Sequence, residues 1–259
     1  MSSIPKIIHQ IWLGRSNRIK NLFMRTVKDH NQNYEYFLWR KKDITKKNFP
    51  LTFPYIQICL KLHKKHNINK YAQISDLMRL EIIYKYGGWY LDSNFEMLTS
   101  LDDIKVKRNK KIIVCNEQKC AWNCVGERIT RKYLSNGAFA SFPHNPHILL
   151  LIKRLYKVNW NSKDIHVETG PYFFRSMFVP QVKRITAMLP FYTFYPFITY
   201  DSEYRKAESP KYLSKSKSKK HNIKIGSNKY IEFPCQPSYY PKSIAVNHLE
   251  LGASWVQKE

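Results

Sequence analysis

The segment from Ser75 to Asn94 carries the residue types best suited to chemistry. Asp76 and Arg79 are three residues apart, so on a helix they lie on the same face. A carboxylate that accepts and a guanidinium that donates hydrogen bonds suit vicinal hydroxyls, although the same spacing also gives ordinary surface ion pairs. Further along, the acidic turn Asp92-Ser93-Asn94 could bind a divalent cation that bridges a diphosphate. It could equally form an Asx turn that bonds only to its own backbone.

A helix and a buried strand are expected to position these residues. Residues 56–86 show apolar positions at helical spacing, and Gly87-Gly88 ends that pattern. Trp89-Tyr90-Leu91 then predicts a short buried strand with Asp92 at its carboxyl end. Open α/β sheets bind ligands at this end of their strands, which favours a binding site over a surface ion pair and an isolated turn.

The remaining pattern predicts an α/β fold. Residues 4–13 and 34–39 are predicted strands on either side of a basic helical segment at 18–30, which is typical of a βαβ unit with parallel strands. Further predicted elements are a buried strand at 111–115, a helix at 146–158, and strands and turns over 230–256. Residues 207–224 are rich in lysine and serine, and we expect a mobile basic loop there.

Length and composition indicate a single domain over residues 1–259. The chain is 43% hydrophobic and 15% aromatic, which is too apolar for a disordered protein. Its apolar run at 148–152 is far shorter than the roughly 20 residues that span a bilayer, and the N-terminus lacks the pattern of a secretion signal. Five dispersed cysteines, an odd number, favour free thiols in a reducing compartment. We therefore expect a cytoplasmic protein.

The charge points to an anionic partner without naming one. Lysine and arginine total 44 against 19 acidic residues, a formal net charge of +25. Nucleic acid, an anionic membrane surface and phosphorylated substrates all satisfy such a charge. No basic and aromatic motif typical of nucleic-acid binding occurs in the sequence. A nucleic-acid-binding module is therefore kept as the alternative of a different class, and no nucleic-acid partner is expected.

Several motifs occur in collinear order along nearly the whole chain. The leading ones are Ile4–Trp12, Ser75-Asp76-x-x-Arg79 and Gly87–Asp92, followed by residues 135–141, 144–146, 168–171, 194–196 and 248–255. With these motifs the chain resembles the DXD-containing, sugar-binding glycosyltransferases of the yeast initiating α-1,6-mannosyltransferase type. It is more distantly similar to the glucosylating clostridial toxins.

The resemblance implies a GT-A fold, which is a Rossmann-like mixed sheet flanked by helices with a smaller acceptor-side and C-terminal region. It also implies a retaining hexosyltransferase. Such an enzyme moves a hexosyl unit from a nucleoside diphosphate sugar, UDP- or GDP-linked, to a glycan or another hydroxyl acceptor. With retention and no assured nucleophile, we expect the acceptor hydroxyl to attack beside the leaving group.

The resemblance further implies roles for individual residues. Asp76 and Arg79 would hold the hydroxyls of the donor sugar, and Asp92 would face the ribose and the metal. The other implied donor and metal contacts are Trp12 on the nucleotide base, Tyr90 near the ribose or sugar, Ser254 and Trp255 at the diphosphate or glycosidic oxygen, and His248 at the metal or a phosphate. Asn136 and Glu168 are candidates near the acceptor or the reactive face of the sugar, and both also fit structural turns.

One departure from the family concerns the metal. Where the family has Asp-x-Asp, this chain has Asp92-Ser93-Asn94. Because an amide brings no charge, Mn²⁺ or Mg²⁺ is expected to bind more weakly through Asp92 and Asn94, and Glu96 could either help or face the edge of the core. Basic residues could replace part of the metal's charge, or the chain could be a pseudoenzyme that binds sugar without transferring it. We rank metal-assisted transfer first.

The same resemblance bears on location and partners. Eukaryotic relatives of this kind commonly sit behind a transmembrane helix, which this sequence does not show. A cytoplasmic enzyme of a bacterium or a large virus, acting in the host cytoplasm if viral, therefore fits better. The basic loop at 207–224 could hold such an enzyme against an anionic membrane.

Overall fold

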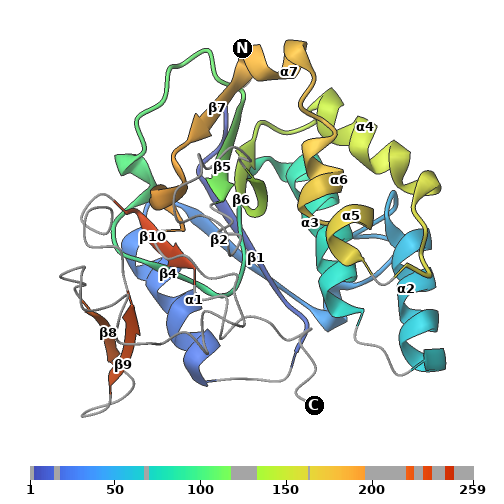
Figure 1. Cartoon of the computed structure of the whole chain (residues 1–259), viewed down its shortest axis with the longest axis horizontal. Coiled ribbons are helices and arrows are strands. Elements are labelled where there is room, and N and C mark those ends of the chain that lie inside the picture. The colour runs from blue at the N-terminus through green and yellow to red at the C-terminus, as the bar shows by residue number, and fades with distance from the viewer. Residues whose placement is uncertain are drawn as a thin grey trace, which may run out of the picture.

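The computed structural model of the chain describes residues 3–14, 18–66, 70–117, 133–162, 164–195, 220–224, 230–234 and 243–247. A six-stranded mixed sheet forms its centre, with helices on both faces (Figure 1). The strand order is β2-β1-β3-β6-β5-β7, with β1 Ile7–Trp12, β2 Glu35–Arg40, β3 Gly88–Leu91, β5 Ile112–Glu117, β6 Tyr133–Ser141 and β7 Thr186–Leu189. The expected α/β class with a mixed sheet flanked by helices is confirmed.

The first three strands of the sheet run parallel. β1 pairs with β2 over its whole length and with β3 on its other side, where Ile8 lies opposite Trp89. Helix α1 (Arg18–His30) connects β1 to β2, so the predicted βαβ unit is confirmed. β6 is antiparallel to both β3 and β5, and β7 is parallel to β5. The carboxyl ends of β1 and β3 therefore lie at the same edge of the sheet.

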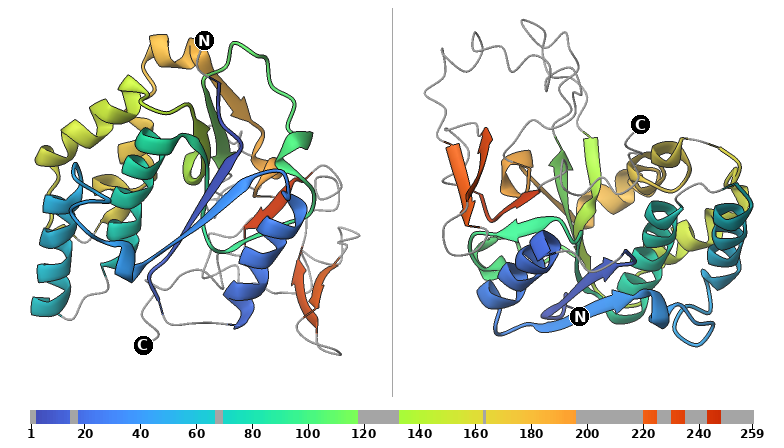
Figure 2. Two further views of the ribbon diagram at one scale, coloured as in Figure 1. Left: turned by 180° about the vertical axis from the view of Figure 1, so that it is seen from behind. Right: turned by 90° about the horizontal axis from the view of Figure 1, so that it is seen from below.

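Helices cover the two faces unequally. α2 (Phe53–His66), α3 (Tyr71–Tyr86), α4 (Pro146–Arg154) and the short helices α5 (Ile165–Glu168) and α6 (Pro171–Arg175) gather on one side, and α1 lies on the other (Figures 1 and 2). The single helical segment expected over 56–86 divides into α2 and α3. The helix expected over 146–158 is α4 followed by a 3-10 turn at Leu155–Lys157, and α7 (Pro180–Ile185) leads into β7.

Two glycines join α3 to β3 with backbone conformations that other residues rarely adopt. Gly87 ends α3 with φ of 67°, and Gly88 opens β3 with φ of 84°. A Cβ at Gly87 would lie 2.7 Å from Cδ of Pro143, and one at Gly88 would collide with the carbonyl oxygen of Ile7. Because only glycine fits both the space and the dihedral angles, this connection is tight. It brings the carboxyl end of β3 back alongside α3.

Strand alternation sorts the buried side chains into two cores. Tyr90 of β3 and Phe139 of β6 belong to the core shared with α2, α3 and α4, whereas Trp89 and Leu91 belong to the core on the α1 side. Side chains two residues apart on a strand share a face. Asp92, two residues after Tyr90, is therefore directed to the α3 side.

Two small sheets accompany the central one. β4 (Phe95–Met97) pairs antiparallel with β10 (Ala245–Asn247), and β8 (Lys220–Lys224) pairs antiparallel with β9 (Tyr230–Pro234). The last five residues of the expected basic loop thus form a strand, and residues 207–219 lie outside the described part of the chain. Among the described residues, no helix combines the length and the apolar character needed to cross a bilayer. A single domain over 1–259 stays a prediction.

Candidate active site

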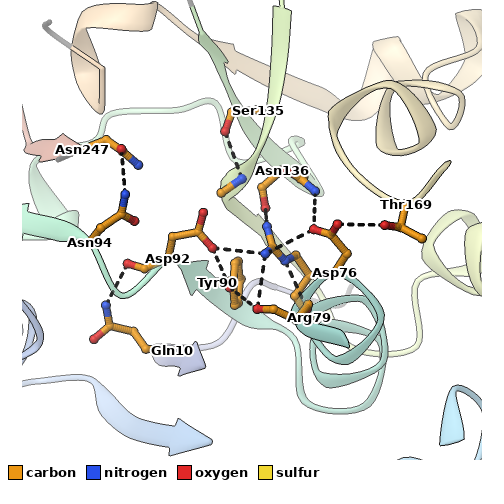
Figure 3. Close-up of polar contacts among 12 residues, drawn as sticks. Gln10, Asp76, Arg79, Tyr90, Asp92, Asn94, Ser135, Asn136, Thr169 and Asn247 are labelled. Carbon is orange, nitrogen blue, oxygen red and sulfur yellow. Dashed lines mark hydrogen bonds and ion pairs between the residues drawn. The ribbon is translucent and has the colours of Figure 1, made fainter. Parts of the chain in front are cut away.

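A buried guanidinium between two carboxylates forms the centre of the site (Figure 3). Nη2 of Arg79 lies 3.2 Å from Oδ1 of Asp76 and 3.2 Å from Oδ1 of Asp92. The side chains of Asp76 and Arg79 are 8% and 7% exposed, whereas that of Asp92 is 31% exposed. The predicted pair on α3 and the predicted turn after β3 therefore meet, with Asp92 on the open side.

Asp76 is held by polar groups from two other parts of the chain. The Asn136 amide nitrogen on β6 donates to Oδ1 of Asp76 at 2.9 Å, and the hydroxyl of Thr169 donates to Oδ2 at 2.9 Å. Burial raises the pKa of Asp76 to about 6, against the opposing attraction of Arg79 and the hydrogen bond from Thr169. The carboxylate is thus kept ionised near neutral pH at a free-energy cost.

Arg79 uses nearly all of its donors inside the protein. Its Nε donates to the backbone oxygen of Ser75 at 3.3 Å, and Nη1 donates to that of Asn136 at 2.8 Å. Its guanidinium carbon also lies 4.5 Å from the ring centroid of Tyr90, within cation–π range. Burial opposes the charged form, but neighbouring anionic groups led by Asp92 raise the pKa of Arg79 above its ordinary value. Arg79 is a permanent cation that fixes both carboxylates.

The carboxylate of Asp92 is held in place by residues of β3 and β6. The hydroxyl of Tyr90, which is fully buried, donates to Oδ1 at 2.7 Å. Oδ2 lies against Gly137 of β6, where an added Cβ would be 2.7 Å from Oδ2 and 2.9 Å from the hydroxyl of Tyr195. Ser135 forms a hydrogen bond with that Tyr195 hydroxyl and accepts one from the backbone nitrogen of Gly137. Gly137 is therefore required for Asp92 to occupy this position.

Acceptor capacity remains on Oδ2 of both carboxylates. Each ionised carboxylate offers about four acceptor positions. Oδ1 of Asp76 and Oδ1 of Asp92 each take two donors, and Oδ2 of Asp76 takes one. Among the described residues, Oδ2 of Asp76 keeps one acceptor position and Oδ2 of Asp92 keeps two. The positions on Asp92, whose side chain is 31% exposed, can accept hydroxyl hydrogens from a bound ligand, whereas Asp76 is almost fully buried.

The turn after Asp92 is fixed at both ends. The Gln10 side chain on β1 donates from Nε2 to the backbone oxygen of Asp92 at 3.1 Å and accepts from the hydroxyl of Tyr36 at 2.8 Å. Asn94 donates from Nδ2 to Oδ1 of Asn247, the last residue of β10, at 3.0 Å. The backbone of the turn is thus held between β1 and β10 (Figure 3).

Other predicted site residues have different surroundings. Trp12, half-buried, ends β1 at the sheet edge where β3 delivers Asp92. Glu168 accepts a hydrogen bond from the backbone nitrogen of Asn159 at 2.8 Å, which fits the structural-turn alternative. Glu96 is half-buried on β4. His248, Ser254 and Trp255 lie outside the described residues.

Five contacts at the candidate site were not predicted from the sequence. They come from Gln10, Thr169, Gly137, Tyr195 and Asn247. All except Asn247 stand inside motifs noted above, so membership of those motifs was the available signal. In the motif at 168–171 it is Thr169 that forms a hydrogen bond with Asp76, whereas the predicted residue Glu168 bonds to Asn159.

The donor set suits only a weakly held divalent cation. Mg²⁺ in proteins is commonly bound by one or two carboxylates together with substrate phosphates and waters. Asp92 can offer Oδ2, and Asn94, whose amide nitrogen donates to Asn247, can offer only a neutral carbonyl oxygen. Among the described residues, no group of three or more His, Cys, Asp or Glu side chains could form a metal cage.

Part of the chain matches a known family of proteins. Residues 16–111 match the family described as "Glycosyltransferase sugar-binding region containing DXD motif". That range contains Asp76, Arg79 and Asp92 and covers the two predicted motifs that carry them. The predicted resemblance to this family is confirmed.

Individual relatives agree with the family match. The chain is 28% identical over 181 residues to "Inositol phosphoceramide mannosyltransferase 2" of Schizosaccharomyces pombe, covering 65% of this chain and 44% of the relative. It is 27% identical to "Inositol phosphoceramide mannosyltransferase 3" of the same yeast, covering 66% and 44%. The chain thus spans less than half the length of these curated relatives. Among solved structures, "PaToxG Glycosyltransferase" is 19% identical with a TM-score of 0.49, covering 70% of each chain.

Proposed function

We propose that this chain is a retaining glycosyltransferase that moves a hexosyl unit from a nucleoside diphosphate sugar to a glycan or another hydroxyl acceptor. The observation that carries the proposal is the Asp76–Arg79–Asp92 network at the carboxyl end of β3. This is the position where α/β sheets bind nucleotides and related ligands. The family match over residues 16–111 covers the same network.

In this proposal the donor lies across the edge formed by β1 and β3. Trp12, at the end of β1, offers a flat surface for a nucleotide base. The diphosphate lies beside the half-exposed carboxylate of Asp92, with Ser254, Trp255 and His248 as further candidate contacts from the C-terminal motif. The hexose lies over Asp76, next to Asn136, and its hydroxyls donate to the unfilled acceptor positions on the two Oδ2 atoms.

Arg79 acts in this proposal as a positioning residue. Its N–H groups already bond to Ser75, Asn136 and both carboxylates, so the carboxylates make the direct contacts with sugar hydroxyls. A carboxylate whose position is fixed before the substrate arrives loses less entropy and reorganises less when the sugar binds. This rigidity is the physical reason for holding two carboxylates around one buried guanidinium.

The reaction requires departure of a nucleoside diphosphate from the anomeric carbon. The sugar gains oxocarbenium character as that bond breaks, and negative charge develops on the leaving phosphate. The acceptor hydroxyl attacks from the same face as the leaving group, so that the new glycosidic bond forms as the bond to the diphosphate breaks and the hydroxyl proton passes to the departing phosphate oxygen. Asp76 and Asp92 hold the ring so that this face meets the acceptor, and Asn136 fixes Asp76.

A divalent cation, Mn²⁺ or Mg²⁺, would be held by Asp92 together with the diphosphate. When bound, it would neutralise charge that develops on the leaving group. Asp92 would supply one oxygen to it while Tyr90 and Arg79 keep the other oxygen in place. The +25 net charge of the chain supports an additional contribution from lysine and arginine side chains to binding the anionic donor.

Calorimetric titration with a panel of nucleotide sugars tests the proposal. Mannosyl donors come first in the panel because the two yeast relatives are named mannosyltransferases. We expect at least one UDP- or GDP-sugar to bind more tightly than its nucleoside diphosphate, and to be transferred or hydrolysed when Mn²⁺ is present. The absence of binding by every donor at millimolar concentration would refute the proposal.

A second candidate, a sugar-binding pseudoenzyme, is favoured by Asn94. This residue stands where the family motif has an acid, and its amide bonds to Asn247. An N94D variant separates the two candidates. A gain in metal-dependent turnover would support an enzyme with a weakened metal site, and donor binding without turnover in both proteins would support the pseudoenzyme.

A further inference from the structure

The amide pair formed by Asn94 and Asn247 has a role beyond the proposed donor contacts. Nδ2 of Asn94 donates to Oδ1 of Asn247 at 3.0 Å, although the two residues are 153 positions apart. The residues are 5% and 2% exposed. A buried amide without a partner is costly, so this bond is strongly favoured once the two segments meet.

The pair adds a side-chain bond to a short strand that is also held by backbone hydrogen bonds, among them those from Leu98 and Thr99 to the carbonyl oxygen of Ile244. β10 is only three residues long and pairs with the three residues of β4. On its other side, the backbone nitrogens of Ile244 and Asn247 donate to the backbone oxygens of Thr193 and Phe194 at 2.9 and 3.1 Å. A three-residue ladder is weak by itself, because strands of this length bury little and form few hydrogen bonds.

The position of the pair connects β10 directly to the site. Asn94 is two residues after Asp92, and Asn247 lies opposite Phe95 in the β4–β10 register. The same turn is held from the other side by the Gln10 bond to the backbone oxygen of Asp92. A displacement of β10 would therefore act on the turn that orients Asp92 (Figure 3).

We propose that the Asn94–Asn247 pair is an uncharged latch that holds β10 against the Asp92 turn, so that this part of the donor site stays assembled without a divalent cation. Asn94 is then a positioning residue that acts through Asn247. The latch itself follows from the contacts of the protein alone, and only its effect on donor binding rests on the proposed function.

Conservative exchange of the partners distinguishes the latch from general packing. An Asp at position 94 can only accept, and the Asn247 amide can rotate to donate to it, so N94D keeps one hydrogen bond. An Ala at either position removes the bond and leaves the other amide buried. Once the bond is gone, the second Ala has less to disrupt, so the two changes should not be additive.

Hydrogen exchange measured by mass spectrometry on the unliganded full chain tests the latch. We expect the peptide that covers residues 243–247 to exchange at least tenfold faster in N94A and in N247A. We expect no further increase in the double variant, near wild-type exchange in N94D, and the same wild-type rate in Mn²⁺ and in EDTA. The matched control is N145A, which removes another buried asparagine whose contacts, Ser141 and His147, lie away from β10, and it should not accelerate this peptide.

Two results would overturn the latch. One is unchanged exchange of residues 243–247 in both alanine variants, and the other is a wild-type peptide whose protection is lost in EDTA. Donor titration then tests the functional half, with at least tenfold weaker binding expected in N94A and no change in N145A. If the wild-type chain bound no nucleotide sugar, the proposed function would fail while the exchange data would still decide on the latch.

Discussion

Replacing Asp76 with asparagine should make the protein more stable at neutral pH and abolish its binding of the nucleotide-sugar donor. The substitution suits the site, because an asparagine oxygen can accept from Arg79 and Asn136, and its nitrogen can donate to the hydroxyl of Thr169. D76N therefore imitates the protonated acid in shape and hydrogen bonding. What it removes is the buried negative charge.

The expected difference in the free energy of unfolding follows from the pKa of Asp76. Burial raises the pKa of Asp76 from its ordinary 3.8 to about 6, even with Arg79 beside it. A pKa difference of this size corresponds to about 3 kcal/mol. Because the folded-state pKa is the higher one, the contribution of Asp76 to stability is present below pH 4 and is lost as the pH rises through about 6. D76N lacks this loss, so it should be more stable than wild type by up to about 3 kcal/mol at pH 7.5 and equal to it near pH 4.

Urea unfolding followed by tryptophan fluorescence at pH 4.0, 6.0 and 7.5 measures this difference. The control is D102N, whose native carboxylate has its pKa lowered to about 2, chiefly by hydrogen bonds from Lys6 and Asn33. D102N should therefore destabilise at pH 7.5, opposite in sign to D76N. A D76N protein that was less stable than wild type at pH 7.5, or that differed from it equally at every pH, would refute the reasoning.

Three further predictions test other parts of the structure. Burial lowers the pKa of His9 to about 4, even though its ring forms a hydrogen bond with the Gly87 carbonyl. The free energy of unfolding should therefore fall by about 3 kcal/mol as the pH drops from above 6.5 towards 4. Urea unfolding at each pH should show this dependence in wild-type protein and not in H9Q. In G137A the new Cβ would meet Oδ2 of Asp92, so nucleotide-sugar affinity in calorimetry should fall at least tenfold, whereas an unchanged affinity would contradict the placement of the carboxylate. Gln73 is fully buried and both its amide atoms lack partners among the described residues, so Q73M should raise the free energy of unfolding by about 1–3 kcal/mol, and a loss of stability would indicate a partner elsewhere.

The local part of the fold and site could be predicted from the sequence. The spacing of Asp76 and Arg79, the two glycines and the short apolar strand before Asp92 are all contained within 17 residues, and each follows from a local rule of helix, cap or strand. The structure confirms that α3 and β3 bring these three charged side chains together. The first βαβ unit was predictable for the same reason.

The long-range contacts could not be predicted in this way. Thr169 reaches Asp76 from 93 residues away, and Asn247 reaches Asn94 from 153 residues away. Neither contact leaves a periodic or compositional signal, because a hydroxyl and an amide are common in turns for local reasons. The sequence identified Asn94 as a departure from the family motif, but only the packing of β10 against β4 shows which residue it contacts.

The most direct test of the central claim is calorimetry of donor binding to wild-type protein and to D92N. In the proposed complex the diphosphate lies beside Asp92 and the hexose lies over Asp76. We expect wild-type protein to bind a nucleotide sugar more tightly than the corresponding nucleoside diphosphate, and D92N to remain folded but to bind both at least tenfold more weakly. Equal binding of the nucleotide sugar by D92N and wild-type protein would contradict the account.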